Sequence, residues 1–214
     1  MSEFASLYQQ LKSRLRAATD PIPWEESKRQ AAVALVLRQH IKSAELLLIK
    51  RALSEHDHWS GHLALPGGRR QAEDTDLCFT AIRETFEEVG IDLASGGEML
   101  GGLEAVKPRS PLAPQIIVKP FVAIAPAEYH ILKQEEEAKG LTLNQEVAVA
   151  FWVPVSLLRE SGRSEIFRLV IDEREHEWPA YATEQGPVWG LTERILTNFF
   201  ASMSEPAENE RRLS

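Results

Sequence analysis

The stretch from Leu65 to Leu93 constrains this chain more than any other. It reads LPGGRRQAEDTDLCFTAIRETFEEVGIDL, a Pro-Gly-Gly turn followed by a segment with helical periodicity that ends at Gly90. Asp74 suits the N-cap of this helix, and Gly90 suits the residue after its C-terminus. Apolar positions recur at i, i+3, i+4 and i+7, which predicts one face packed against a core. The residues of this face are Cys78, Ala81, Ile82, Thr85 and Val89.

Acidic residues gather on a different flank of the predicted helix. Glu84, Glu87 and Glu88 lie three and four residues apart, and Arg83 adjoins them. Like charges at these spacings destabilise a helix by about 0.2–0.5 kcal/mol per pair, and acids in the last turn also oppose the helix dipole. A bound cation would reverse both effects, and an oxygen-only ligand set suits a hard divalent ion. The alternative is a solvated acidic face, the usual environment of a charge run.

The spacing of these residues resembles a known family signature. Gly68, Arg83-Glu84, Glu87-Glu88, Gly90 and Ile91 together resemble the signature of the Nudix hydrolases. Members of this family cleave a nucleoside diphosphate linked to another group, with divalent metal bound on the signature helix. The general signature has seven residues between its first acid and the Arg-Glu pair. Here Asp74 takes the place of that acid, and eight residues separate it from Arg83.

This one-residue extension points to a branch of the family. Together with Pro66-Gly67-Gly68 and the run TAIRE ending at Glu84, it resembles the branch that contains the coenzyme A pyrophosphatases. Two positions depart from that branch. Leu65 stands where the branch has phenylalanine, and Asp57 stands where it has a basic residue.

The resemblance implies a magnesium or manganese site. Glu84 and Glu88 would be the principal ligands, Glu87 would be a third ligand or bind through water, and the Gly68 carbonyl would be an additional ligand. Arg83 would orient these carboxylates. Asp74 could pair with Arg83 or simply cap the helix.

A general base and phosphate-binding groups are expected outside the helix. Nudix enzymes often use a glutamate on a loop that faces the metals. Glu146 is the best-placed candidate, Glu104 is the next, and Glu87 could also serve. Arginine offers a bidentate fork to phosphate, so three arginines are candidates for substrate binding, with a solvated surface position as the alternative for each. They are Arg51, Arg69 and Arg109.

Composition limits the partners and the compartment. The net charge of −8 argues against a nucleic-acid backbone as the main partner. No apolar run reaches the length of about 18 residues that a membrane span needs. The single cysteine forbids an internal disulfide and fits a reducing compartment, so we expect a cytoplasmic protein. The N-terminal helix and exposed loops could support a homodimer.

The rest of the chain predicts one α/β domain. An N-terminal helix and linker should occupy residues 1–29, the Nudix domain 30–203, and a polar, disordered tail 204–214. Within the domain we expect strands at Ala31–Leu37, Glu45–Arg51, Met99–Lys107, Gln115–Ile124 and Ala148–Val153, a hairpin from Glu165 to Tyr181, and helices at Val155–Glu160 and Gly190–Ser202. The family resemblance makes this an α/β/α sandwich with a mixed sheet, plus the N-terminal helix.

Three functions remain open at this point. The first is a metal-dependent pyrophosphohydrolase acting on coenzyme A or a derivative. The second is a Nudix hydrolase of nucleotide sugars, dinucleotides or nucleoside triphosphates. The third is a non-catalytic Nudix fold that only binds a ligand, which the loss of a metal-binding glutamate would favour. No such loss is seen in this sequence.

Overall fold

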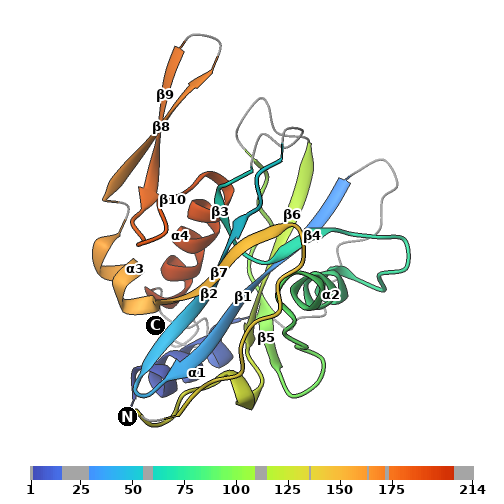
Figure 1. Ribbon diagram of the computed structural model, residues 1–214, viewed down its shortest axis with the longest axis vertical. Helices are drawn as coiled ribbons and strands as arrows, with labels where there is room; N and C mark the ends of the chain where they lie inside the picture. The colour runs from blue at the N-terminus through green and yellow to red at the C-terminus, as the bar shows by residue number, and fades with distance from the viewer. Residues whose placement is uncertain are drawn as a thin grey trace, which may run out of the picture.

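The computed structural model describes residues 2–15, 29–54, 60–108, 115–134, 136–162, 164–171 and 174–204 (Figure 1). Arg109 and Asp57 lie outside the described residues. So do all but the last residue of the predicted linker from Thr19 to Arg29 and all but the first residue of the predicted tail from 204 to 214. Among the described segments, no helix is long and apolar enough to cross a membrane.

A seven-stranded mixed sheet forms the centre of the molecule. Its order is β3-β2-β1-β6-β5, with β4 also paired to β1 and β7 to β2. Strands β1 and β6 are parallel, and the other pairs are antiparallel. The strands are β1 (Arg29–His40), β2 (Ser43–Arg51), β3 (Leu63–Ala64), β4 (Gly67–Arg69), β5 (Glu98–Gly102), β6 (Ile116–Ile124) and β7 (Val147–Pro154).

Strand β1 supplies both hydrophobic cores. Successive side chains of a strand point to opposite faces, so Leu35 and Leu37 pack in one core while Ala34 and Val36 pack in the other. Buried residues on both faces explain why this segment reads as a continuous apolar run instead of an alternating one.

Helices cover both faces of the sheet, as the sequence predicts. Figure 1 shows α2 on one side of the sheet and α3 and α4 on the other. The N-terminal helix joins the second group, because its Leu7 and Leu11 belong to the core shared with α3 and α4. The helices are α1 (Glu3–Arg14), α2 (Leu77–Val89), α3 (Val155–Ser161) and α4 (Gly190–Ser204), with a 3₁₀ turn at Ala127–Tyr129. The predicted α/β/α sandwich with an N-terminal helix is confirmed.

A second, three-stranded sheet lies near α4. It consists of β8 (Glu165–Ile171), β9 (Arg174–Tyr181) and β10 (Val188–Trp189) in the order β10-β9-β8. The predicted hairpin is therefore confirmed, and its two strands project away from the main sheet in Figure 1.

The Pro-Gly-Gly segment forms more than the predicted turn. Strands β1 and β2 pair only near the connection between them, from Leu37↔Leu46 to His40↔Ser43. Farther along, β3 pairs with β2 and β4 pairs with β1, so the segment from residue 63 to 69 fills the space where the two long strands diverge. Gly67 and Gly68 thereby become part of the sheet, directly beside α2. The strand predicted from Met99 to Lys107 is shorter, because pairing with β6 ends at Gly102 apart from one bridge at Val106.

Candidate active site

Asp76, not Asp74, caps the start of α2. Its carboxylate accepts a hydrogen bond of 2.8 Å from the Phe79 N–H, and its extended backbone is typical of an N-cap. The predicted N-cap at Asp74 is therefore wrong, because the helix begins three residues later at Leu77. The other end agrees with the sequence: Gly90 has φ of 75° and its N–H donates to the Phe86 carbonyl.

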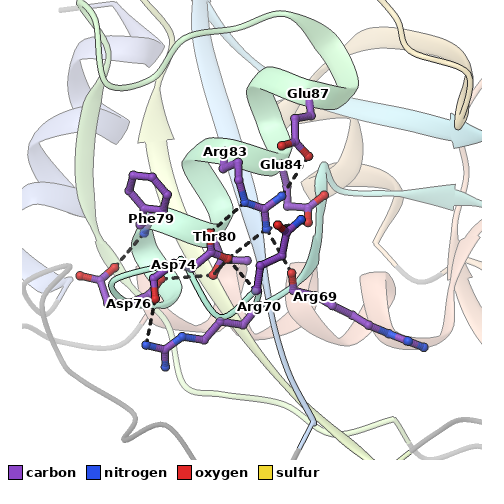
Figure 2. A network of polar contacts seen from close by, with 10 residues as sticks. Arg69, Arg70, Asp74, Asp76, Phe79, Thr80, Arg83, Glu84 and Glu87 are labelled. Atoms are coloured by element: carbon purple, nitrogen blue, oxygen red, sulfur yellow. Dashed lines mark hydrogen bonds and ion pairs between the residues drawn. The ribbon is translucent and has the colours of Figure 1, made fainter.

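Asp74 instead holds Arg83, the second of the two roles left open for it. Its buried carboxylate accepts hydrogen bonds from Arg83 Nε at 2.9 Å and Nη2 at 3.0 Å, from Thr80 Oγ1 at 2.9 Å and from the Gln71 N–H at 2.9 Å (Figure 2). Burial acts to raise the pKa of Asp74, but these hydrogen bonds outweigh it and leave the pKa below its usual value. The carboxylate is thus ionised and fixes the arginine.

Arg83 in turn contacts two of the three glutamates. Its Nη2 lies 2.9 Å from Glu84 Oε1, and its Nη1 lies 2.9 Å from Glu87 Oε2. Nη2 also donates to the Arg69 carbonyl at 3.1 Å, which ties the helix to β4. Hydrogen bonding to Asp74, and then the charge of Glu84, raises the pKa of Arg83 above its usual value. Figure 2 shows the guanidinium beside Glu84 and Glu87.

Glu88 has a different environment, which its place in the charge run did not reveal. The residue is 2% exposed, and its Oε2 accepts a hydrogen bond of 2.8 Å from the Gly67 N–H. Burial raises the pKa of Glu88 to about 8; the Gly67 bond and Arg51 act against this rise, and the charges of Glu84 and Glu146 add to it. Glu88 is therefore a buried carboxylate beside β4, not part of a solvated acidic face.

Gly68 is packed against Glu84. A Cβ at residue 68 would lie 2.5 Å from the carboxylate carbon of Glu84, so only glycine allows this approach without a shift. Burial is the largest cause that raises the pKa of Glu84, Arg83 lowers it, and Glu87 and Glu146 raise it further. Side chains of α2 and the backbone of β4 thus enclose two acidic groups.

Two residues from distant parts of the chain join this group. Glu146 precedes β7, and its negative charge is felt by both Glu84 and Glu88. Arg51 ends β2, and its positive charge lowers the pKa of Glu88. Glu146 and Arg51 lie on neighbouring strands because Arg51 pairs with Val147, the residue after Glu146. This pairing lies next to a register shift of the kind made by a β-bulge. Glu104 is exposed in the segment between β5 and Val106.

The donor set suits a divalent cation, although the side chains do not converge as they stand. Among the described residues, no group of three acidic, histidine or cysteine side chains is arranged to hold a metal ion. Instead of facing one another, the carboxylates of Glu84 and Glu87 form ion pairs with Arg83, and that of Glu88 accepts a hydrogen bond from Gly67. All the candidate donors are hard oxygens. Burial is the largest cause that raises the pKa of Glu84 and of Glu88, and the charges of neighbouring carboxylates, which a cation would offset, add to it. The residues therefore fit such an ion by the chemistry of their donors.

The other predicted arginine is not brought into the site. The Arg69 side chain is exposed and points away from Arg83 in Figure 2; only its carbonyl takes part in the network. The sequence analysis also missed three contributors: the Gly67 N–H, the Thr80 hydroxyl and Arg70, which donates to the carbonyls of Asp74 and Thr75. The position of Thr80, six residues after Asp74, was a usable sequence signal for its hydroxyl. No local sequence pattern marks the Gly67 N–H.

Comparisons with known proteins agree with this arrangement. The NUDIX domain family model matches residues 27–172. An uncharacterized Nudix hydrolase, NudL of Enterobacter sp. (strain 638), is 31% identical over 198 residues, which is 92% of this chain and 91% of that protein. The uncharacterized protein C14C4.10c of Schizosaccharomyces pombe is 40% identical over 95 residues, but the match spans 43% of this chain and 29% of that protein.

A solved structure supports the fold. The MutT/nudix family protein from Enterococcus faecalis has a TM-score of 0.53 to this chain and 16% sequence identity, covering 95% of this chain and 69% of the other. Nudix hydrolases generally use divalent metal ions, in agreement with the oxygen donors gathered around α2. From the matched family region, the full-length relative and the shared fold, the chain belongs to the Nudix family and is a hydrolase of the pyrophosphatase class.

Proposed function

We propose that this hydrolase cleaves the pyrophosphate of coenzyme A or of an acyl derivative, with Mg²⁺ or Mn²⁺ as the metal. One observation carries the catalytic part of the proposal: Glu84 and Glu88 of α2 lie within electrostatic reach of Glu146, and Glu88 within reach of Arg51, although these residues come from separate parts of the chain. The coenzyme A part rests on the sequence, namely the eight residues between Asp74 and Arg83 and the motifs around them.

In this proposal Glu84 and Glu88 hold the metal, Glu87 is a third ligand or binds it through water, and the Gly68 carbonyl adds a further oxygen. When bound, a divalent ion supplies charge neutralisation at phosphate and lowers the pKa of water. Arg83 orients the carboxylates through its contacts with Glu84 and Glu87.

Glu146 is the proposed general base. It takes the proton of the attacking water while the oxygen of that water bonds to one phosphorus, and the bond from this phosphorus to the bridging oxygen breaks. The second phosphate leaves with the bridging oxygen. Glu146 suits the role better than Glu87, because Glu87 is paired with Arg83. Arg51 is the described arginine best placed for substrate phosphate, since its charge already reaches Glu88.

Substrate identity is tested by product analysis. Purified protein with Mg²⁺ is incubated separately with coenzyme A, nucleotide sugars, dinucleotides and nucleoside triphosphates, and the products are identified by mass spectrometry. We expect 4′-phosphopantetheine and 3′,5′-ADP from coenzyme A. Survival of coenzyme A while another compound is consumed would refute the coenzyme A assignment and leave the hydrolase class intact.

Chelation with EDTA should abolish hydrolysis, and Mg²⁺ or Mn²⁺ should restore it; full activity without metal would refute the metal role.

The general base is tested by Glu146→Gln. Loss of general-base catalysis usually lowers kcat by about 10²–10⁴-fold. We expect kcat to fall by this amount. Metal binding, measured by calorimetric titration with Mn²⁺, should be nearly unchanged. A change below about fivefold would transfer the role to Glu87 or Glu104.

A further inference from the structure

The segment from Leu141 to Val147 leads into the start of β7 and lies beside the end of α2. Two of its N–H groups donate to carbonyls in the last turn of the helix: Thr142 to Val89 at 3.1 Å and Asn144 to Glu88 at 3.2 Å. The last carbonyls of a helix have no partner within it, so these bonds satisfy groups that would otherwise need water. The segment is thereby attached to the turn of α2 that carries the glutamates.

Asn144 is bonded to the backbone of Glu88, a proposed metal ligand, and to that of Glu146, the proposed base. Its N–H donates to the Glu88 carbonyl, and its side-chain Oδ1 accepts a hydrogen bond of 2.9 Å from the Glu146 N–H. Asparagine commonly bonds to the backbone two residues ahead, which fixes the turn that follows it. One residue thus connects the backbone of Glu88 with the backbone of Glu146.

Few other contacts fix the backbone of Glu146. Its carbonyl accepts a hydrogen bond of 2.8 Å from the Ala52 N–H, just past the end of β2. Its side chain is exposed, so packing against neighbours does not hold it. Among the hydrogen bonds of the described residues, the one from the Glu146 N–H to Asn144 Oδ1 links Glu146 to a residue attached to α2.

We infer that Asn144 is a positioning residue that sets the place of Glu146 relative to Glu88 on α2. This inference rests on the proposed role of Glu146 as general base. A base must lie within about 2.6–3.2 Å of the oxygen atom whose proton it takes. A displacement of about 1 Å in a catalytic group can cost about a hundredfold in rate, so a turn that fixes the base contributes to kcat without touching substrate.

Substitution of Asn144 in the full-length protein tests the inference. Asn144→Ala removes the bond to the Glu146 N–H and keeps the main-chain bond to Glu88. We expect kcat to fall by about tenfold to a hundredfold while KM stays within about twofold. Asn144→Ser should recover part of the loss, because a serine hydroxyl accepts the same N–H more weakly. Gln145→Ala is the matched control, since that side chain is exposed in the same turn, and it should change kcat by less than twofold.

A double-mutant cycle separates positioning from a general structural role. In the Glu146→Gln background, Asn144→Ala should cause no further loss of kcat, because the group it positions is already inactive. A second loss of equal size in that background would overturn the positioning role while leaving Glu146 as the base. A Glu146→Gln enzyme of near-normal kcat would instead overturn the base assignment, and the positioning role with it. Thermal unfolding of each variant checks the fold; if Asn144→Ala does not fold, the cycle is run with Asn144→Ser, which weakens the bond without removing it.

Discussion

At the scale of single residues, the pKa of a buried acid depends on the hydrogen-bond donors around it. Asp74 is surrounded by four hydrogen bonds, two of them from Arg83, and remains ionised in spite of burial. Glu88 is equally buried but accepts only the Gly67 N–H among the bonds described, and its pKa is raised. The first acid is therefore suited to fixing a cation of the protein, and the second to receiving one from solvent.

Asp74→Asn should reveal this difference as a pH-dependent loss of stability. Breaking a buried ion pair costs about 3 kcal/mol in free energy of unfolding. Because the pKa of Asp74 is lowered in the folded state, its stabilising effect is complete above the unfolded pKa of about 3.9 and is lost as pH falls through the folded pKa. Urea unfolding of wild type and variant should differ fully at pH 7, and the difference should shrink as pH falls below the unfolded pKa.

The control for this experiment is an exposed pair. Glu177, paired with Arg168 on the β8–β9 hairpin, is 53% exposed, so Glu177→Gln should cost less than about 1 kcal/mol. An equal loss for Asp74→Asn at pH 3 and pH 7 would contradict the ionised pair.

At the scale of elements, the contact between β4 and α2 builds the site. Strand β4 pairs with β1 on one edge and presents Gly67 and Gly68 to the glutamates of the helix. The two glycines meet different neighbours. Gly67 has φ of 151°, which residues with a side chain rarely adopt, and a Cβ there would lie 2.3 Å from the Ala32 carbonyl oxygen. A Cβ on Gly68 would instead contact the end of the Glu84 side chain.

The pair Gly67→Ala and Gly68→Ala should therefore separate stability from activity. Gly67→Ala clashes with backbone that cannot move alone, so we expect a loss of about 2–4 kcal/mol in stability. Gly68→Ala can be accommodated by a shift of Glu84, so stability should change by less than about 1 kcal/mol while kcat falls at least tenfold. Each variant serves as the control of the other in thermal unfolding and turnover assays. Full activity in Gly68→Ala would show that the close approach to Glu84 is not required.

At the scale of the whole molecule, α1 lies outside the matched family region but completes one of the two hydrophobic cores. The matched region begins at residue 27, yet Leu7 and Leu11 are buried with residues of α3 and α4. Tyr8 adds a hydrogen bond of 2.8 Å from its hydroxyl to Glu98 on β5. The helix lies on the face of the sheet opposite α2, so it supports the fold without bordering the site.

Leu11→Ala should lower stability without affecting catalysis. Leu11 is 1% exposed, and removing a buried leucine side chain costs about 2–5 kcal/mol. We expect this loss in chemical unfolding, with kcat and KM unchanged at a temperature where the variant is folded. Gln9→Ala, at an exposed position of the same helix, is the control. A large fall in kcat for folded Leu11→Ala would indicate coupling between α1 and the site.

The sequence by itself determined the features that depend on local spacing. Periodicity located α2, its end at Gly90 and the glutamates on it, and apolar runs located β1, β2, β6 and β7 within a few residues. These predictions succeed because a helix repeats every 3.6 residues whatever surrounds it, and because a strand buried on both faces reads as a continuous apolar run. The sequence predicts only a turn at Pro66-Gly67-Gly68, because β3 and β4 are two and three residues long, too short for a recognisable pattern.

Only the tertiary structure decided which groups meet. The sequence predicts Asp74 as the helix cap, but in the folded chain Asp74 bonds to Arg83 and Asp76 caps the helix. The burial of Glu88 follows from the pairing of β4 with β1, and the meeting of Glu146 with Arg51 follows from the pairing of β7 with β2. These contacts join residues far apart along the chain, so they depend on the packed sheet and not on any local pattern.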